Sequence, residues 1–290
     1  MKKTYVLIIF CLCVCEIFAQ NYAVSLIPDS LKLGAQAVVR EQKEFFVQKD
    51  ERNGTYKCMR VITIFNEKGL KHAKFIVGTD DFEELKSFLG EVFDANGKSI
   101  KKIKQKDLQS LQYSASYELV KNAKATYYEY FSPVFPFTVK YEWELKLKDG
   151  ILYYPSFDPI LDYDVALEKA EYTLQVPDAQ VVRYKNSATD ISPAINGNTY
   201  IWSAENMKMI EYERFAPSNA VFPIVYLAPE NFCVQTACGN MKTWENYGYW
   251  VQDLQKGRDV LPENIKAKVA ELTQNISDKR EKVRVLYDFM

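Results

Sequence analysis

The sequence predicts a mainly β protein, an antiparallel β-sandwich followed by a short C-terminal helical segment. In the segment 138–148, apolar and polar residues alternate without exception, which is the pattern of a strand with one face toward solvent. After residue 242, apolar residues recur at helical spacing, which is typical of amphipathic helices. The strand-like runs follow one another without helices between them. This favours antiparallel pairing, because parallel strands need a long crossover connection.

The other expected strands are rich in β-branched and aromatic residues. Turn sequences such as Asn53-Gly54 and Asn196-Gly197-Asn198 separate them. These strands cover residues 38–47, 56–65, 74–77, 125–131, 170–176, 181–184 and 199–202. Lysines gather within residues 98–106, and we interpret this run as an edge strand, because lysines at an edge discourage pairing with other sheets.

The first nineteen residues are expected to be a secretory signal peptide. Lys2 and Lys3 precede an apolar run over residues 5–15, and the small residue Ala19 follows. We therefore expect domain boundaries of 1–19 for the signal, 20–240 for the sandwich and 241–290 for a helical linker. No later run reaches the roughly 18 apolar residues that a spanning helix needs, so no transmembrane helix is expected in the mature chain. The protein is then exported, and is periplasmic or associated with the cell envelope.

Composition argues against several classes of function. Lysine and arginine number 37 against 38 aspartate and glutamate, and the net charge of −1 argues against a dedicated nucleic-acid binder. His72 is the single histidine of the sequence, so a catalytic or metal site that needs two imidazoles is excluded. The sequence contains no glycine-rich phosphate loop and no paired-cysteine zinc motif, and we expect no cofactor.

Three cysteines remain after the expected signal peptide. Cys58 lies in an alternating strand pattern, where a small buried side chain is the favoured interpretation. Cys233 and Cys238 can form a disulfide if a turn brings their Cα atoms within about 7 Å, and the sequence leaves the bridged and free forms open. A catalytic pair of Cys58 or Cys233 with His72 is disfavoured, because neither thiol shows a cationic setting or a helix N-terminus.

Two further clusters have both an ordinary and a functional interpretation. Asp158, Asp162 and Asp164 offer hard oxygen ligands to calcium, but they lack the spacing and the glycine of an EF-hand loop, so a solvated loop is favoured. The aromatic segment 127–137 could form a platform for a glycan or a peptide, although core packing explains most residues of this kind.

Two helices are expected directly after the sandwich. Thr243 is a suitable N-cap for the first helix, and Gly257 follows its end. Pro262 suits the first turn of the second helix. The apolar stripe of the first helix consists of Trp244, Tyr247, Val251 and Leu254, and that of the second consists of Ile265, Val269, Leu272 and Ile276.

A third helix is expected to begin at a capping box formed by Asp278 and Glu281. Its apolar face includes Val283 and Leu286 and continues to Met290. That face shows no C-cap signal and has no later segment to pack against. We therefore expect this chain to be the front part of a longer polypeptide.

A series of spaced single residues runs through the second half of the sequence, namely Trp202, Asn206, Glu211, Pro217, Pro223, Trp244, Trp250, Val283, Leu286 and Tyr287. The turn around Asn66 and Gly69, and the segment 93–98 followed by Ile100, add to this series. Together they resemble exported bacterial proteins in which an uncharacterised N-terminal β-sandwich domain precedes a transglutaminase-like core. The resemblance implies that segment 241–290 is a helical linker and the start of a truncated transglutaminase-like domain. It also implies that the Cys, His and Asp of that papain-like core lie beyond the helix that begins near Arg280, so no residue here is assigned to catalysis.

The function expected from these observations is that of a non-catalytic, exported β-sandwich module. It would dock on or position a downstream transglutaminase-like domain that is absent from this chain. The expected interaction surface consists of Trp244, Tyr247, Trp250, Ile265, Val269 and Leu272. The alternative is a self-sufficient module that binds an envelope glycan or peptide through the segment 127–137. An enzyme complete in this chain is the least favoured hypothesis.

Overall fold

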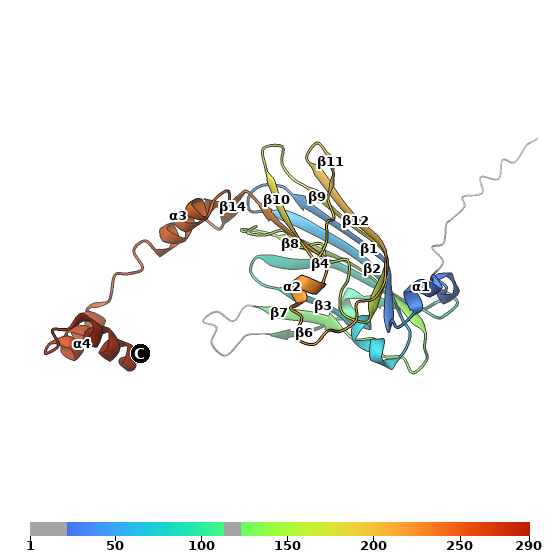
Figure 1. Ribbon diagram of the computed structural model, residues 1–290, viewed down its shortest axis with the longest axis horizontal. Helices are drawn as coiled ribbons and strands as arrows, with labels where there is room; N and C mark the ends of the chain where they lie inside the picture. Colours follow the sequence, from blue (N-terminus) through green and yellow to red (C-terminus); the bar gives the residue numbers. More distant parts are fainter. Residues whose placement is uncertain (1–21, 113–122) are drawn as a thin grey trace, which may run out of the picture.

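A computed structural model describes residues 22–112 and 123–290, and the expected signal peptide lies outside the described residues. Strands with a few short helical turns make up the described chain to Asn240, and longer helices follow (Figure 1). The strands are β1 (Ala37–Gln48), β2 (Gly54–Ile64), β3 (Phe75–Thr79), β4 (Glu83–Phe93), β5 (Ser99–Lys104), β6 (Gln109–Gln112), β7 (Lys124–Tyr128), β8 (Phe137–Leu147), β9 (Val165–Gln175), β10 (Val182–Ser187), β11 (Ala194–Asn196), β12 (Thr199–Met207), β13 (Ile224–Pro229), β14 (Asn231–Val234) and β15 (Ala237–Asn240). The helices are η1 (Val24–Leu26), α1 (Asp29–Lys32), η2 (Glu67–Ala73), η3 (Gln105–Asp107), α2 (Ser218–Val221), α3 (Trp244–Gln255), α4 (Glu263–Thr273) and α5 (Lys279–Phe289).

One layer of the sandwich is an eight-stranded sheet in the order β11-β12-β9-β1-β2-β8-β4-β5. Its strand pairs are antiparallel except for β1 and β9, which run parallel. The expected antiparallel sandwich is therefore confirmed, with one parallel pair that the local pattern did not indicate. The long connection from Gln48 to Val165 contains several other strands, so it easily supplies the crossover that a parallel pair requires.

The second layer consists of two small sheets, β3-β7-β6 and β10-β13. They cover the inner face of the large sheet, and the core forms between the layers. The largest fully buried side chains there include Phe46, Phe137, Phe157, Tyr172 and Trp202. The alternation in segment 138–148 is confirmed as β8, since its apolar residues point into this core.

The outer face of the large sheet is covered at one end by the N-terminal segment 22–35. Ile27 and Leu31 pack there on Val38 of β1. Because of this cover, Thr138 is fully buried, although its place on the polar side of the alternation predicted contact with solvent. Its hydroxyl is paired with that of Thr63 at 2.8 Å, which satisfies both groups away from water.

The lysine-rich strand lies at the edge of the sheet, as expected. β5 is the last strand of the order and pairs only with β4 in that sheet. Ile103 points into the core, while the lysine side chains of β5 are exposed. The strand therefore closes the sheet with charges that oppose pairing with another molecule.

The inner face also holds a buried polar group. Burial raises the pKa of Glu44, while hydrogen bonds from Tyr56 Oη at 2.5 Å and Gln42 Nε2 at 2.5 Å act to lower it. Arg60 Nε donates to Gln42 Oε1 at 2.9 Å and so joins the same network. The network satisfies these groups in a region where an unpaired polar atom would be costly.

Three helices follow the last strand. α3 packs on the β14-β15 hairpin, and α4 packs on α5. Figure 1 shows α3 beside β14 at one end of the sandwich and α4 farther out along an extended connection. The part of the chain that the structure describes holds no helix with the length and apolarity needed to cross a bilayer.

Candidate functional site

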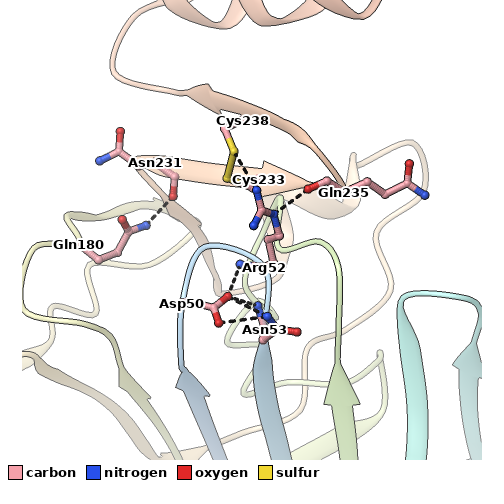
Figure 2. Close-up of a disulfide and its surroundings, with 8 residues drawn as sticks. All are labelled: Asp50, Arg52, Asn53, Gln180, Asn231, Cys233, Gln235 and Cys238. Atoms are coloured by element: carbon pink, nitrogen blue, oxygen red, sulfur yellow. Dashed lines mark hydrogen bonds between the residues drawn. A yellow bond between two sulfur atoms is a disulfide. The ribbon is translucent and has the colours of Figure 1, made fainter.

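The β14-β15 hairpin forms the base of the candidate interaction surface. Cys233 and Cys238 stand opposite each other in its register, with their Cα atoms 4.0 Å apart, and form a disulfide (Figure 2). This decides between the two alternatives that the sequence left open. The bridge closes a small loop, and it holds the two strands of a hairpin that is too short to be stable by itself.

The turn between β1 and β2 fixes this hairpin to the sandwich. Arg52 Nε donates to the Gln235 carbonyl oxygen at 2.6 Å, and Arg52 Nη2 lies 3.6 Å from Cys238 Sγ (Figure 2). Asp50 stabilises the turn, because its carboxylate accepts hydrogen bonds from the backbone N–H groups of Arg52 at 2.8 Å and Asn53 at 2.9 Å. Desolvation acts to raise the pKa of Asp50, but these hydrogen bonds outweigh it, and the pKa is lowered.

α3 is attached to the hairpin through aromatic side chains. The Trp250 ring meets the Phe232 ring edge-on with 5.0 Å between centroids, and Tyr247 lies 6.4 Å from Phe232. Gly239 allows this approach, since a Cβ there would lie 2.6 Å from Phe232 and 2.8 Å from Trp250. Trp244, in contrast, is 88% exposed. Of the three α3 residues on the expected interaction surface, Tyr247 and Trp250 therefore contact the hairpin, and Trp244 is left in solvent.

α4 and α5 pack on each other and leave large apolar side chains in solvent. Val269 and Leu272 are half-buried in α4, whereas Ile265 is exposed. In α5, Val283 is 67% and Tyr287 is 77% exposed. None of the described side chains of α3, α4 or α5 is buried. Helices of this length are marginal in water without a packed face, so an additional contact would stabilise them.

The free thiol of the described residues is unsuited to nucleophilic chemistry. Cys58 is buried in the sheet, and burial raises the pKa of its thiol well above the ordinary value, with the Glu44 carboxylate acting in the same direction. The reactive thiolate is therefore scarce at neutral pH. Cys233 and Cys238 are bound to each other.

The acidic residues divide into two places. His72, Asp162 and Asp164 approach one another within 4.8 Å, and Asp158 is not part of this group. Lys71 Nζ already supplies a cation there, 2.7 Å from Asp162 and 3.8 Å from Asp164. Burial lowers the pKa of His72, which keeps the imidazole neutral. This arrangement favours a solvated loop held by the ion pair of Lys71 with Asp162 over the calcium site that the sequence also allowed.

The aromatic segment 127–137 is largely packed. Phe137 is buried and is in contact with Tyr130 and Phe135, at centroid distances of 5.3 Å and 5.6 Å. Lys101 Nζ lies over the rings of Tyr128 and Tyr130, at 5.6 Å and 5.5 Å. Phe131 is the exposed aromatic ring of the segment. A broad aromatic platform is thus not formed at this place.

Sequence reasoning missed a groove near the N-terminus of α3. It has a volume of about 420 Å³ and is lined by Tyr153, Arg183, Met241, Lys242, Thr243, Trp244 and Tyr247. These residues come from separate parts of the chain. The sequence marked Thr243 as an N-cap and Trp244 and Tyr247 as part of a helical stripe, and the basic residue Arg183 within an expected strand was a further sign.

Comparison with known proteins gives one family. The model of DUF3857, described as a domain of unknown function with a solved structure, matches residues 50–211, which is more than half of the chain. No curated protein matches the sequence.

Among solved structures, a "putative protease" from Parabacteroides distasonis aligns with a TM-score of 0.64 and 14% identity. The alignment covers 88% of this chain and 50% of that chain, so the chain spans half the length of that protein. At this identity the likeness shows the fold alone. An M1 zinc metallopeptidase from Deinococcus radiodurans aligns with a TM-score of 0.29 and 7% identity, over 66% of this chain and 42% of that chain. A TM-score this low supports no conclusion about the fold or the function of this chain.

Proposed function

Since the chain belongs to the DUF3857 family, we propose that it is a non-catalytic β-sandwich module that docks on or positions another domain of its own polypeptide. We propose further that this other domain is the transglutaminase-like core suggested by the sequence resemblance. The module acts in the cell envelope or periplasm, after export. Its role is mechanical, in that it holds the partner domain at one end of the sandwich.

One observation carries the proposal: α4 and α5 expose apolar side chains that the described chain does not cover. Ile265 lies on the stripe of α4, and Val283 and Tyr287 lie on α5. Large exposed apolar residues on neighbouring helices are typical of an interaction surface. The coverage of half of the Parabacteroides distasonis protein is consistent with a partner domain beside the sandwich, although it does not identify that domain.

The chemistry of the described residues supports a non-catalytic role. Cys58 is buried, and its thiol has a raised pKa. Cys233 and Cys238 are joined in a disulfide that fixes the hairpin beneath α3. These cysteines therefore serve packing and rigidity, and the reacting groups belong to the proposed partner domain.

The attachment of α3 supports the mechanical role. Trp250 and Tyr247 join α3 to the hairpin, and Arg52 joins the hairpin to the turn between β1 and β2. The contacts continue from the sandwich through the hairpin to α3. The α4–α5 pair then follows on the connection after α3 and presents its apolar side chains to the partner.

A comparison of two chain lengths tests the docking surface. The full 290-residue chain should bind a dye specific for exposed apolar surface, and a chain ending at Leu261 should bind much less of it. The unfolding midpoint of the sandwich should be the same in both, since α4 and α5 contain no buried residue. Equal dye binding by the two chains would remove the proposed surface.

A pair of substitutions gives the matched control. Ile265→Glu places a charge on the exposed apolar stripe of α4, and Lys266→Glu places the same charge one residue away on its polar side. Only the first should lower dye binding. If both lower it equally, the effect is one of net charge and not of this surface.

A further inference from the structure

Two adjoining grooves form one continuous surface at the end of the sandwich where α3 is attached. The first groove, of about 400 Å³, crosses the face of the β10-β13 pair, and the second, of about 420 Å³, extends to the N-terminus of α3. Tyr153 and Arg183 line both. We call this surface the β10–α3 groove. Figure 1 shows α3 leaving the sandwich beside β14, the strand that follows β13 in the chain.

The groove is basic in a chain of nearly balanced charge. Arg183, Lys185 and Lys242 line it, and none of the described residues lining its two parts is aspartate or glutamate. Glu245, which follows Trp244 in the chain, accepts a hydrogen bond from Tyr249 Oη at 2.8 Å. The local charge is therefore positive, although the net charge of the whole chain is −1. A ligand with negative charge is electrostatically complementary to this surface.

The N-terminus of α3 adds to this potential. Thr243 caps the helix, because its Oγ1 accepts a hydrogen bond from the Asn246 backbone N–H at 3.1 Å. The backbone N–H groups of the first turn before Asn246 have no hydrogen-bond partner within the helix. The dipole of a helix of 12 residues places partial positive charge at this end. Lys242 and Trp244 flank the cap, so the positive end of the helix and the cations lie at the same part of the groove.

Aromatic rings form much of the remaining surface. Trp244 is 88% and Tyr153 is 57% exposed, and Tyr226 is also exposed. Burial raises the pKa of Tyr153, and the neighbouring Tyr247 acts in the same direction, so Tyr153 stays neutral. Exposed rings beside cations offer flat apolar faces together with charge, a combination that core packing does not require.

We propose that the β10–α3 groove binds an acidic glycan, with sugar rings against Trp244, Tyr153 and Tyr226 and carboxylates beside Arg183, Lys185 and Lys242. The register of the strands favours a glycan over a peptide. Arg183 and Lys185 stand opposite Ala228 and Tyr226, so these side chains share one face of the β10-β13 pair. An extended peptide commonly binds at a strand edge through backbone hydrogen bonds, whereas this groove crosses a face made of side chains.

The inference is independent of the proposed docking function. The groove uses the N-terminus of α3 and the sandwich, while docking uses the exposed stripe of α4 and α5. Ile265→Glu should therefore leave glycan binding unchanged, and loss of glycan binding should leave the dye-binding difference between the two chain lengths unchanged.

Titration calorimetry on the 290-residue chain tests the proposal with defined probes. The acidic probes are oligogalacturonate and hyaluronate oligosaccharides. The methyl ester of the same oligogalacturonate serves as the uncharged control, and poly-glutamate as the acidic peptide. We expect saturable binding of an acidic glycan that weakens with added salt and by about tenfold or more in the methyl ester.

Two aromatic residues of nearly equal exposure provide the matched variants. Trp244→Ala should weaken binding of the acidic glycan by about tenfold or more, because exposed anchor rings carry a large share of binding energy. Phe215→Ala removes a ring that is 87% exposed but does not line the groove, and it should leave binding unchanged. Near-ultraviolet circular dichroism checks that both variants keep the fold.

Several results would overturn the proposal. Failure of both acidic glycans to bind would do so, as would equal binding of the methyl ester. Tighter binding of poly-glutamate would make the surface a peptide groove instead. Equal effects of Trp244→Ala and Phe215→Ala would place the binding site elsewhere.

Discussion

Gly239→Ala should loosen α3 from the sandwich without unfolding the sandwich. The added Cβ would lie 2.6 Å from Phe232 Cζ and 2.8 Å from Trp250 Cγ, closer than real Cβ contacts, so one of these rings must move. The Phe232 ring is fully buried, whereas Trp250 is only half-buried, so we expect Trp250 and its helix to shift. Overpacking of this kind costs about 1 to 3 kcal/mol.

Hydrogen exchange measures that cost in α3 directly. A loss of about 1 to 3 kcal/mol of local stability corresponds to faster amide exchange by about fivefold to 150-fold. The backbone of Gly239 does not have the positive φ that disfavours alanine, so the effect reports the ring contact. Exchange in β1 and β9 should not change.

Gly248→Ala is the control within the same helix. A Cβ at Gly248 meets no described heavy atom within 4 Å, and alanine is the better helix former by about 1 kcal/mol. This variant should slow exchange in α3. If Gly239→Ala leaves exchange in α3 unchanged, or if both variants shift it in the same direction, the contact of Trp250 with Phe232 does not hold the helix.

Three further predictions concern the sandwich and its hairpin. The double variant Cys233→Ser, Cys238→Ser should lower the free energy of unfolding of the hairpin by about 2 kcal/mol, because the disulfide closes a loop of sequence separation 5. Urea unfolding of the wild-type chain and the variant, with and without reductant, measures this difference. Burial raises the pKa of Glu44, so the stability that this group contributes is present below the ordinary glutamate pKa and is lost as the pH rises through the raised value. Glu44→Gln should therefore flatten the dependence of the urea midpoint on pH above the ordinary glutamate pKa, and a variant that keeps the wild-type dependence would contradict this. Tyr172→Phe should leave the free energy of unfolding unchanged or raise it by up to about 1 kcal/mol, since the Tyr172 hydroxyl has no hydrogen-bond partner among the described residues. Tyr141→Phe should lower it by about 1 kcal/mol, because it removes the 2.7 Å hydrogen bond to the Ala73 carbonyl oxygen. The opposite order of stability in thermal unfolding would contradict this.

Much of the fold was predictable from local pattern. The alternation in segment 138–148 gave β8, and the lysines within 98–106 indicated the edge position of β5. Such patterns indicate which face of a strand is exposed to solvent, because successive side chains point to opposite faces of a sheet. They do not report partners that come from far along the chain. The parallel pairing of β1 with β9 and the burial of Thr138 under the N-terminal segment depend on such partners.

The candidate site was predictable only in part. The helices after residue 242 were expected, but helical spacing is satisfied by Trp244 with Tyr247 and equally by Tyr247 with Trp250. The choice between them depends on Phe232 and on the small Gly239 in the hairpin. The β10–α3 groove combines residues from segments far apart in sequence, so only the folded chain brings them together.

The most direct test of the docking function is hydrogen exchange over residues 263–289 in the polypeptide encoded by the whole gene, compared with the 290-residue chain. If α4 and α5 dock on a partner domain, their amides should exchange about tenfold or more slowly in the product of the whole gene. Ile265→Glu should reverse that protection, and Lys266→Glu should not. Equal exchange over residues 263–289 in the two polypeptides would contradict docking through these helices.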